Sequence, residues 1–341
     1  MELALRKEKI LSAVVEKYIE SGEPIGSKAL LTATGLDVSS ATIRNELKAL
    51  DDEGYLTQPH TSAGRIPTKK GYRYYIDNLM QPRELPPAVR EHIDEALSPS
   101  AQAPEVVLSK TASLLARLCD AAAITTTPSS DEARVHRIRF VATGRHTSMA
   151  VLVTSNGMVK SRLFRCEFVL TPQLLAMFDK AVNEQFTGVR LREITKGFLQ
   201  TAASAMGEMT LFVPDALIAV YEAVRSALEV SVTVTGQTNL LFSDGYDFRS
   251  ARDVMKFLSD SGRLSKLLNN TRSSKIYLGE ESRIPELSTS AVISSRYEIA
   301  GETAGAVAVI APLRIDYAAV RSEVDYAAAS VSRAIGEILE Q

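Results

Sequence analysis

The segment from Gly35 to Leu47 constrains the fold of this chain more than any other part of its sequence. It reads Gly-Leu-Asp-Val-Ser-Ser-Ala-Thr-Ile-Arg-Asn-Glu-Leu. Gly35 permits a tight turn and Ser39 is a good N-cap, so we expect a helix that begins at Ser39 and ends at Gly54. Three apolar residues recur along it at helical spacing and predict its buried face: Ile43, Leu47 and Leu50. The polar residues between them are expected to point mostly outward.

Two helices are expected before this segment and a hairpin after it. Leu3 to Ile19 has the apolar periodicity of an amphipathic helix, and a shorter helix follows it. Tyr55 to Pro59 and Arg65 to Thr68 are predicted to pair as two strands, joined by a turn over His60 to Gly64. Three helices followed by such a wing predict a winged helix-turn-helix, which we assign to residues 1–80.

The third predicted helix carries candidate DNA contacts. In a helix-turn-helix, the second helix of the pair enters the DNA major groove, which is roughly 12 Å wide. Six polar residues of this helix and its N-cap are the candidates: Ser39, Ser40, Thr42, Arg44, Asn45 and Lys48. Arg44 is suited to read a guanine and Asn45 an adenine, and a phosphate contact is the alternative for both.

Two further groups of residues are candidate contacts to the DNA backbone. Ser27 and Lys28 begin the second helix, where the helix N-terminus and a positive charge favour a phosphate. The alternative for this pair is an ordinary N-cap beside a solvated lysine. The predicted wing offers hydrogen-bond donors to the backbone or the minor groove: His60, Thr61, Ser62, Arg65, Thr68 and Lys69. The alternative for the wing is a plain solvated hairpin.

The charge of the chain favours a nucleic-acid partner only locally. The whole chain has 39 Lys and Arg residues against 41 Asp and Glu residues, a net charge of −2, so its composition does not indicate such a partner. Between His60 and Tyr75, however, four basic residues stand without an acidic one: Arg65, Lys69, Lys70 and Arg73. We therefore expect a local basic patch beside the third helix.

The sequence contains no pattern that indicates a metal, a cofactor, export or a membrane. Cys119 and Cys166 lie far apart and form no CxxC pair, and the four histidines show no HxxxH or HExxH spacing. The first ten residues include five charged ones and no apolar run, which argues against a secretory signal. No apolar stretch is long enough to span a bilayer, so we expect a cytoplasmic protein with no membrane partner.

The residues after position 80 predict an α+β arrangement. The proline-rich stretch 81–87 is expected to be a linker, and 125–131 a loop. Helices are predicted at 88–97, 105–123, 252–268 and 318–339, and helical periodicity dominates 170–199 and 201–228. Strands are predicted at 135–141, 148–153, 158–168, 230–234, 275–278, 290–297 and 305–310.

Three long runs resemble the family of heat-inducible transcription repressors HrcA. They are residues 22–28, 38–47 and 54–68, which read GEPIGSK, VSSATIRNEL and GYLTQPHTSAGRIPT. Shorter runs at 236–241, 279–281 and 312–317 extend the resemblance through the C-terminal part. The Gly-Gln-Thr-Asn run at 236–239 departs from the Gly-Gly-Thr/Ala-Asn run that the family often has.

The resemblance implies three domains and a regulatory function. The domains are the winged helix-turn-helix at 1–80, a GAF-like domain at 88–140 and 230–341, and a dimerisation domain inserted at 141–229. It implies a homodimer that binds a double-stranded, inverted-repeat operator of chaperonin and chaperone operons. It also implies that the protein is associated with the nucleoid, and that a GroEL-type chaperonin keeps the repressor active. We expect the dimer contacts in the helical stretch from Leu170 to Leu228.

Two alternatives from other functional classes are kept open. An enzyme joined to a winged helix, as in biotin-protein ligases, would need catalytic residues, but the chain has no GxxxxGK[ST] loop and no GxSxG elbow. The carboxylate pairs Asp244 with Asp247 and Glu280 with Glu281 are interpreted as surface groups, so no enzyme is predicted. The second alternative is a ligand-sensing regulator, because GAF-like folds often hold small molecules. No cluster of polar residues in the sequence indicates such a ligand site.

Overall fold

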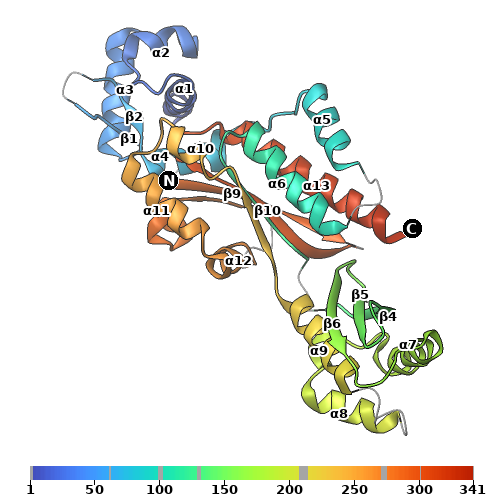
Figure 1. Ribbon diagram of the computed structural model, residues 1–341. Helices are drawn as coiled ribbons and strands as arrows, with labels where there is room; N and C mark the ends of the chain where they lie inside the picture. The colour runs from blue at the N-terminus through green and yellow to red at the C-terminus, as the bar shows by residue number, and fades with distance from the viewer. Residues whose placement is uncertain are drawn as a thin grey trace.

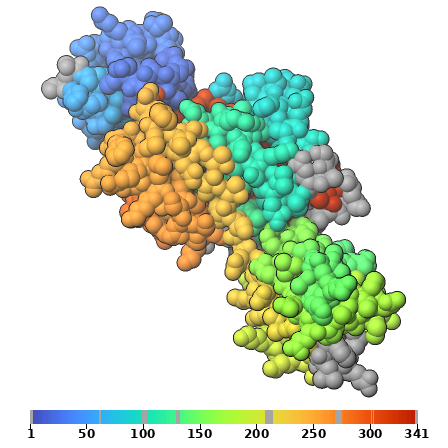
Figure 2. All heavy atoms as spheres, in the orientation of Figure 1, coloured from blue at the N-terminus to red at the C-terminus, as the bar shows by residue number. Residues whose placement is uncertain are grey.

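The computed structural model describes residues 3–60, 63–98, 103–128, 132–206, 214–269, 275–299 and 301–340. They form three units that follow one another in a line (Figures 1 and 2). A small helical unit with a hairpin lies at one end, a five-stranded sheet between layers of helices lies in the middle, and a second α/β unit lies at the other end. The described helices are all too short or too polar to cross a bilayer.

The N-terminal unit has the elements of the predicted winged helix-turn-helix. They are α1 (Leu5–Ser21), α2 (Ser27–Thr34), α3 (Ser40–Asp52), β1 (Leu56–Thr57), β2 (Ile66–Pro67), α4 (Lys69–Tyr74) and a π-helical turn, η1 (Tyr75–Leu79). Ile25 forms an isolated antiparallel bridge with Arg65, which extends the hairpin by a third short strand. The hairpin is the predicted wing.

Two glycines determine how closely the wing approaches its neighbours. A Cβ atom on Gly64 would lie 2.4 Å from the carbonyl carbon of Ile25, and one on Gly71 would lie 2.1 Å from the carbonyl oxygen of Tyr55. Any side chain at either position would push these backbones apart. Because both residues are glycines, α4 and the segment before α2 can lie directly against the hairpin.

The middle unit is built on an antiparallel sheet with the strand order β7-β3-β10-β9-β8. The strands are β3 (Ala122–Thr126), β7 (Val232–Thr235), β8 (Lys275–Leu278), β9 (Ser290–Ile299) and β10 (Glu302–Pro312). Short 3₁₀ turns, η4 (Gly279–Ser282) and η5 (Pro285–Leu287), connect β8 to β9. The predicted α+β class is confirmed, whereas the GAF-like character of this unit stays a prediction.

Helices cover both faces of this sheet (Figure 1). One layer holds α5 (Pro87–Leu97), α6 (Pro104–Leu118) and α13 (Tyr317–Glu340), and the other holds α10 (Asn239–Phe242), α11 (Phe248–Leu258) and α12 (Ser261–Asn269). Successive residues of a strand point to opposite faces. Accordingly, Val307 and Val309 belong to the core beneath the first layer, while Ala308 and Ile310 belong to the core beneath the second. The first core continues without a break into the winged helix.

Two element predictions in this unit are wrong. The helix expected over 105–123 ends at Leu118, and the following Ala122–Thr126, partly expected as a loop, is the fully buried strand β3. A short apolar run has no periodicity that separates a buried strand from a helix, which explains the error. The single helix expected at 252–268 is two helices, since Asp260 accepts a hydrogen bond from the backbone N–H of Arg263 (3.0 Å) and caps a new one.

The third unit is inserted between two neighbouring strands of the sheet. Thr126 pairs with Val232, and the N–H of Thr127 donates to the carbonyl oxygen of Ser231 at 2.9 Å, so the chain leaves and re-enters the sheet side by side. The inserted unit, residues 132–228, has the sheet order β4-β5-β6, with β4 (Val135–Ala142), β5 (Thr147–Thr154) and β6 (Val159–Arg165). The predicted domain edge at 140/141 is therefore too late, because β4 belongs to this sheet.

Helices cover one face of the inserted sheet and leave the other open. The helices are α7 (Pro172–Phe186), the short turn η2 (Leu191–Glu193), α8 (Lys196–Ala205) and α9 (Pro214–Leu228), and their buried residues form one core with the inward residues of the strands. On the opposite face, large apolar side chains are exposed: Val141, Val159 and Leu163. The core of this unit is separate from the two cores of the middle unit.

The predicted linker 81–87 packs against the rest of the protein. It has no helix before Pro87, as expected, but Leu85 is buried in the core that joins the winged helix to the middle unit. Arg83 forms an ion pair with Asp316 (2.8 Å), and its carbonyl oxygen accepts a hydrogen bond from Ser322 at the start of α13 (2.5 Å). The linker therefore holds the winged helix against the middle unit.

Candidate nucleic-acid interface

Helix α3 presents the predicted row of polar side chains on its outer face. Its inner face is buried through Ile43, Leu47 and Leu50, each at most 5% exposed. Four of the predicted contact residues are exposed, and two are half-buried near the start of the helix: Ser39, Arg44, Asn45 and Lys48, then Ser40 and Thr42. The amphipathic pattern therefore predicted the outward face of this helix correctly.

The hydroxyl groups at the start of α3 also hold the helix pair together. The Ser39 hydroxyl accepts a hydrogen bond from the Thr42 backbone N–H (3.1 Å), which is the N-cap expected from the sequence. The hydroxyls of Ser27 and Ser40 lie 3.1 Å apart and connect the first turn of α2 to that of α3. The N-termini of both helices are therefore close to each other, and the exposed Lys28 lies beside them.

The cations of this helix pair have no acidic partner. In the described ranges, no carboxylate lies within ion-pair distance of Lys28, Arg44 or Lys48. Cations that are both exposed and unpaired keep their charge available for a phosphate or a base edge. This face of α2 and α3 therefore carries three exposed cations that have no ion-pair partner among the described residues.

The wing gives a mixed result for the predicted contacts. His60 is exposed in the turn that follows β1, whereas Thr61 and Ser62 lie outside the described residues. Arg65 forms an ion pair with Asp51 at the end of α3 (3.0 Å) and is half-buried. The Thr68 hydroxyl donates to the carbonyl oxygen of Gly54 (2.7 Å) and caps α4. These two side chains already fix the wing to its own domain.

Lys69 points toward the middle unit and not toward a free surface. Its ammonium group contacts both carboxylate oxygens of Glu280 in η4, at 2.5 Å each. This hydrogen-bonded pair lowers the pKa of Glu280 below its ordinary value, so the carboxylate stays charged at neutral pH. We therefore leave Lys69 out of the candidate interface.

The basic patch expected beside the third helix is not a free cationic surface. Besides Arg65 and Lys69, Arg73 pairs with Glu281, and Lys70 donates to the carbonyl oxygen of Glu53 (2.7 Å) and lies 4.2 Å above the ring of Tyr55. The expectation was wrong because two of the acidic partners come from about 200 residues later in the chain. The free cations lie instead on α2 and α3.

Side chains to which sequence reasoning gave no such role fix the winged helix on the middle unit. Arg73 donates to the carbonyl oxygen of Ile276 (2.7 Å) in addition to its pair with Glu281. Arg314 donates to the carbonyl oxygen of Ile19 at the end of α1 (3.2 Å). The rings of Tyr72 and Tyr317 have centroids 5.6 Å apart across the same junction. The runs 279–281 and 312–317 marked this region in the sequence, but gave no role to its side chains.

The carboxylate pairs considered for catalysis have other partners. Glu280 and Glu281 bind two different cations of α4, and Asp247 accepts a hydrogen bond from the Ser250 N–H (2.7 Å), which caps α11 and lowers the pKa of Asp247. Asp244 lies 4.0 Å from Arg314. In the described part of the chain, no group of three or more His, Cys, Asp or Glu side chains is arranged to hold a metal ion.

Comparison with known proteins identifies relatives for both parts of the chain. The family model "HrcA protein C terminal domain" matches residues 105–320, and the model "Ribonuclease R winged-helix domain" matches residues 8–74. Two relatives carry the name heat-inducible transcription repressor HrcA. The one from Syntrophobacter fumaroxidans is 33% identical over 98% of both chains, and the one from Lachnoclostridium phytofermentans is 31% identical over 94% of both chains. A crystal structure titled as that of a hypothetical protein has the same fold, with a TM-score of 0.70, 25% identity, and coverage of 99% of this chain and 100% of that one.

Proposed function

The chain belongs to the HrcA family of heat-inducible transcription repressors, and we propose that it represses heat-shock operons by binding an inverted-repeat operator as a homodimer. The observation that carries this proposal is the row of Arg44, Asn45 and Lys48 on the outer face of α3. These side chains are exposed, lack partners among the described residues, and stand on a helix whose opposite face is anchored in the core. Membership of a repressor family also argues against the enzyme alternative.

The chemistry of this row suits a major groove. The Arg44 guanidinium can donate two hydrogen bonds to a guanine edge, and the Asn45 amide can both donate to and accept from an adenine edge. Lys48 and Lys28 carry point charges that suit backbone phosphates, and the N-terminus of α2 adds its free N–H groups. On this assignment, Arg44 and Asn45 specify the sequence while the lysines position the helix.

A homodimer would match the symmetry of an inverted repeat, because two identical winged helices then meet two identical half-sites. We assign the dimer contact to the inserted unit. The open face of its sheet has an apolar row, since Val141 pairs with Met149 and Met149 pairs with Leu163, and Leu163 is 69% exposed. Apolar side chains in such a row are typical of a surface that a second copy covers. The helices from Leu170 to Leu228, expected earlier as the contact, cover the other face.

The dimer assignment is tested with Leu163→Glu and, as control, Val106→Glu at an exposed position of α6. A buried charge on the contact row is expected to yield a monomer in sedimentation analysis, and to weaken binding to the inverted repeat much more than binding to a single half-site. The control is expected to leave the dimer intact. A Leu163→Glu protein that remains dimeric would exclude this face.

We also propose that a GroEL-type chaperonin keeps the repressor active, as the family resemblance implies. The physical hypothesis is a repressor of marginal stability that the chaperonin refolds, so that unfolded clients compete for the chaperonin during heat stress. Purified protein is heated, cooled and titrated with operator DNA from the chaperonin operon, with and without chaperonin. We expect operator binding to recover more fully with chaperonin, and equal recovery in both samples would refute the hypothesis.

A further inference from the structure

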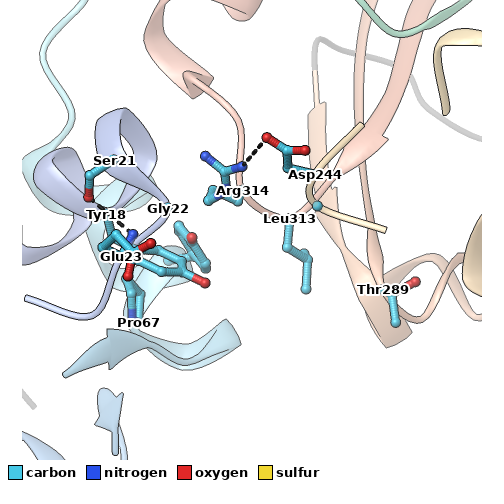
Figure 3. Close-up of a pocket in the computed structure, with 11 residues that line it drawn as sticks. Tyr18, Ser21, Gly22, Glu23, Pro67, Asp244, Thr289, Leu313 and Arg314 are labelled. Atoms are coloured by element: carbon cyan, nitrogen blue, oxygen red, sulfur yellow. Dashed lines mark hydrogen bonds and ion pairs between the residues drawn. The ribbon is translucent and has the colours of Figure 1, made fainter. Parts of the chain in front are cut away.

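A cleft of about 550 Å³ separates the winged helix from the middle unit. Figure 3 shows Tyr18, Glu23 and Pro67 of the winged helix on one side, and Leu313 and Asp244 of the middle unit on the other. Arg314 lies between the two sides. Volumes of this size are typical of small-molecule sites, which occur preferentially where two domains meet. The DNA face of α3 is not part of its lining.

Tyr72 is among the residues that line this cleft, and its buried hydroxyl lacks a partner. Tyr72 is 3% exposed, and its hydroxyl makes no hydrogen bond in the described part of the chain. Burial raises the pKa of Tyr72, so the hydroxyl keeps its proton at neutral pH and is able to donate it to an acceptor. A buried polar group without a partner costs stability, and native structures seldom keep one without a function or a bound molecule.

Arg314 provides a positive group whose hydrogen-bonding capacity is largely unused. One of its terminal nitrogens donates to the carbonyl oxygen of Ile19 at 3.2 Å, and the other lies 4.0 Å from Asp244, at the outer limit of an ion pair. A guanidinium has five N–H donors in a planar fork, which matches the two oxygens of a carboxylate. Gly22 leaves room for it, because a Cβ there would lie 3.2 Å from the guanidinium carbon.

The other charged groups of the cleft restrict the charge of a ligand. Asp244 and Glu23 are exposed and line it together with Arg314, so the cleft offers one positive and two negative groups. A phosphate or a tricarboxylate would meet two carboxylates of like charge. A single carboxylate satisfies Arg314 with less of this repulsion, and an ammonium group on the same ligand would face Asp244.

We propose that this cleft binds a small monocarboxylic acid, free amino acids included, whose carboxylate faces Arg314 and whose second polar group accepts a hydrogen bond from Tyr72. Tyr72 lies in α4 of the winged helix, and Arg314 lies between β10 and α13 of the middle unit. A ligand held by both therefore stabilises one orientation of the winged helix relative to the rest of the chain. The proposed ligand site is independent of the proposed operator binding, and its test contains no DNA.

The test titrates the full-length protein, by calorimetry and thermal shift, with the free amino acids and a set of two- to six-carbon monocarboxylates. Inorganic phosphate and citrate are the comparison anions. We expect at least one monocarboxylate to bind saturably at one site per chain and to raise the melting temperature, and we expect the two comparison anions not to bind there. Saturation by phosphate or citrate alone, or by none of the probes, would overturn the proposal.

Two conservative variants locate the site. Tyr72→Phe removes only the unpaired hydroxyl and is expected to melt no lower than the unchanged protein while binding the acid about tenfold more weakly, the loss of one hydrogen bond. Arg314→Lys is expected to weaken binding further, because lysine lacks the planar fork. Tyr221→Phe and Arg249→Lys, outside the cleft, are the matched controls. Affinity that is the same in all four variants would exclude this cleft as the site.

Discussion

Arg44, Asn45 and Lys48 differ from most other polar side chains of the winged helix in having no partner among the described residues. Lys7 contacts Glu53, Arg65 contacts Asp51, and the serines at the helix starts bond one another. On α3, Arg44, Asn45 and Lys48 stay free, whereas the candidate contacts at its start, Ser39, Ser40 and Thr42, also bond within the domain. At the residue scale, the proposed roles of Arg44, Asn45 and Lys48 in reading DNA therefore rest on their exposure and on their lack of partners.

The pair Arg263–Glu286 gives a pH prediction at this scale. Two hydrogen bonds from Arg263, at 2.7 and 2.9 Å, lower the pKa of Glu286 from 4.5 to about 2. Because the folded pKa is below the unfolded one, the pair stabilises the protein fully above about pH 4.5 and loses this effect as the pH falls toward 2. The difference in melting temperature between the unchanged protein and Glu286→Gln should therefore shrink between pH 5 and pH 3. A difference that does not vary over this range would contradict the assignment.

The sequence predicted the role of a single residue correctly where its hydrogen-bond partner is close along the chain. Ser39 and Thr68 cap the helices that follow them by accepting a hydrogen bond from a backbone N–H three residues later, and the apolar spacing of α3 identified its outer face. It was uninformative where the partner is distant, as for Lys69 and Arg73, whose carboxylate partners Glu280 and Glu281 lie more than 200 residues later. Local charge counting cannot detect such pairs, so the predicted basic patch failed.

At the element scale, amphipathic helices and alternating strands were predicted well, because their periodicity records which face is buried. The three strands of the inserted unit and the long helix α13 lie within a few residues of their predicted ranges. The buried strand β3 was missed because all of its residues are buried and no alternation remains. The break between α11 and α12 was missed because an Asp cap inside an apolar pattern resembles an ordinary surface residue.

The contact between α4 and the wing gives a prediction at this scale. A Cβ on Gly71 would lie 2.1 Å from the Tyr55 carbonyl oxygen, so Gly71→Ala is expected to destabilise the winged helix by about 1–3 kcal/mol. Gly336 in α13 has nothing within 4 Å of its Cβ position, so Gly336→Ala is expected to stabilise the chain by roughly 0.5–1 kcal/mol. Thermal unfolding of both variants measures these changes in stability. Equal changes in the two variants would contradict the close approach of Gly71 to the Tyr55 carbonyl oxygen.

At the scale of the whole molecule, the winged helix is fixed to the middle unit, while the inserted unit emerges from two paired strands. The first junction has a continuous apolar core and charged contacts through Lys69, Arg73 and Arg314. The second is formed by the pairing of β3 with β7, with Lys160 and Glu105 3.4 Å apart beside it. In the dimer that we propose, we expect the position of each winged helix to depend mainly on the angle of the inserted unit.

A charge exchange tests the first junction. Arg73→Glu places a third carboxylate beside Glu281 and Asp77 and is expected to lower stability by about 1–2 kcal/mol, given that these groups are partly exposed. Adding Glu281→Arg is expected to restore part of this loss, because the ion pair re-forms while the bond to the Ile276 carbonyl oxygen does not. Losses that simply add in the double variant would show that the two side chains are not coupled.

The central claim is that the outer face of α3 reads the operator. The most direct measurement is the affinity of the unchanged protein, Arg44→Ala and Arg249→Ala for operator DNA from a chaperonin operon and for a scrambled duplex at one salt concentration. We predict that Arg44→Ala lowers operator affinity by about 10- to 100-fold and scrambled-DNA affinity much less, the effect of losing a base contact. Arg249→Ala, an exposed arginine of α11, should change neither. An operator preference that survives Arg44→Ala undiminished would contradict the claim.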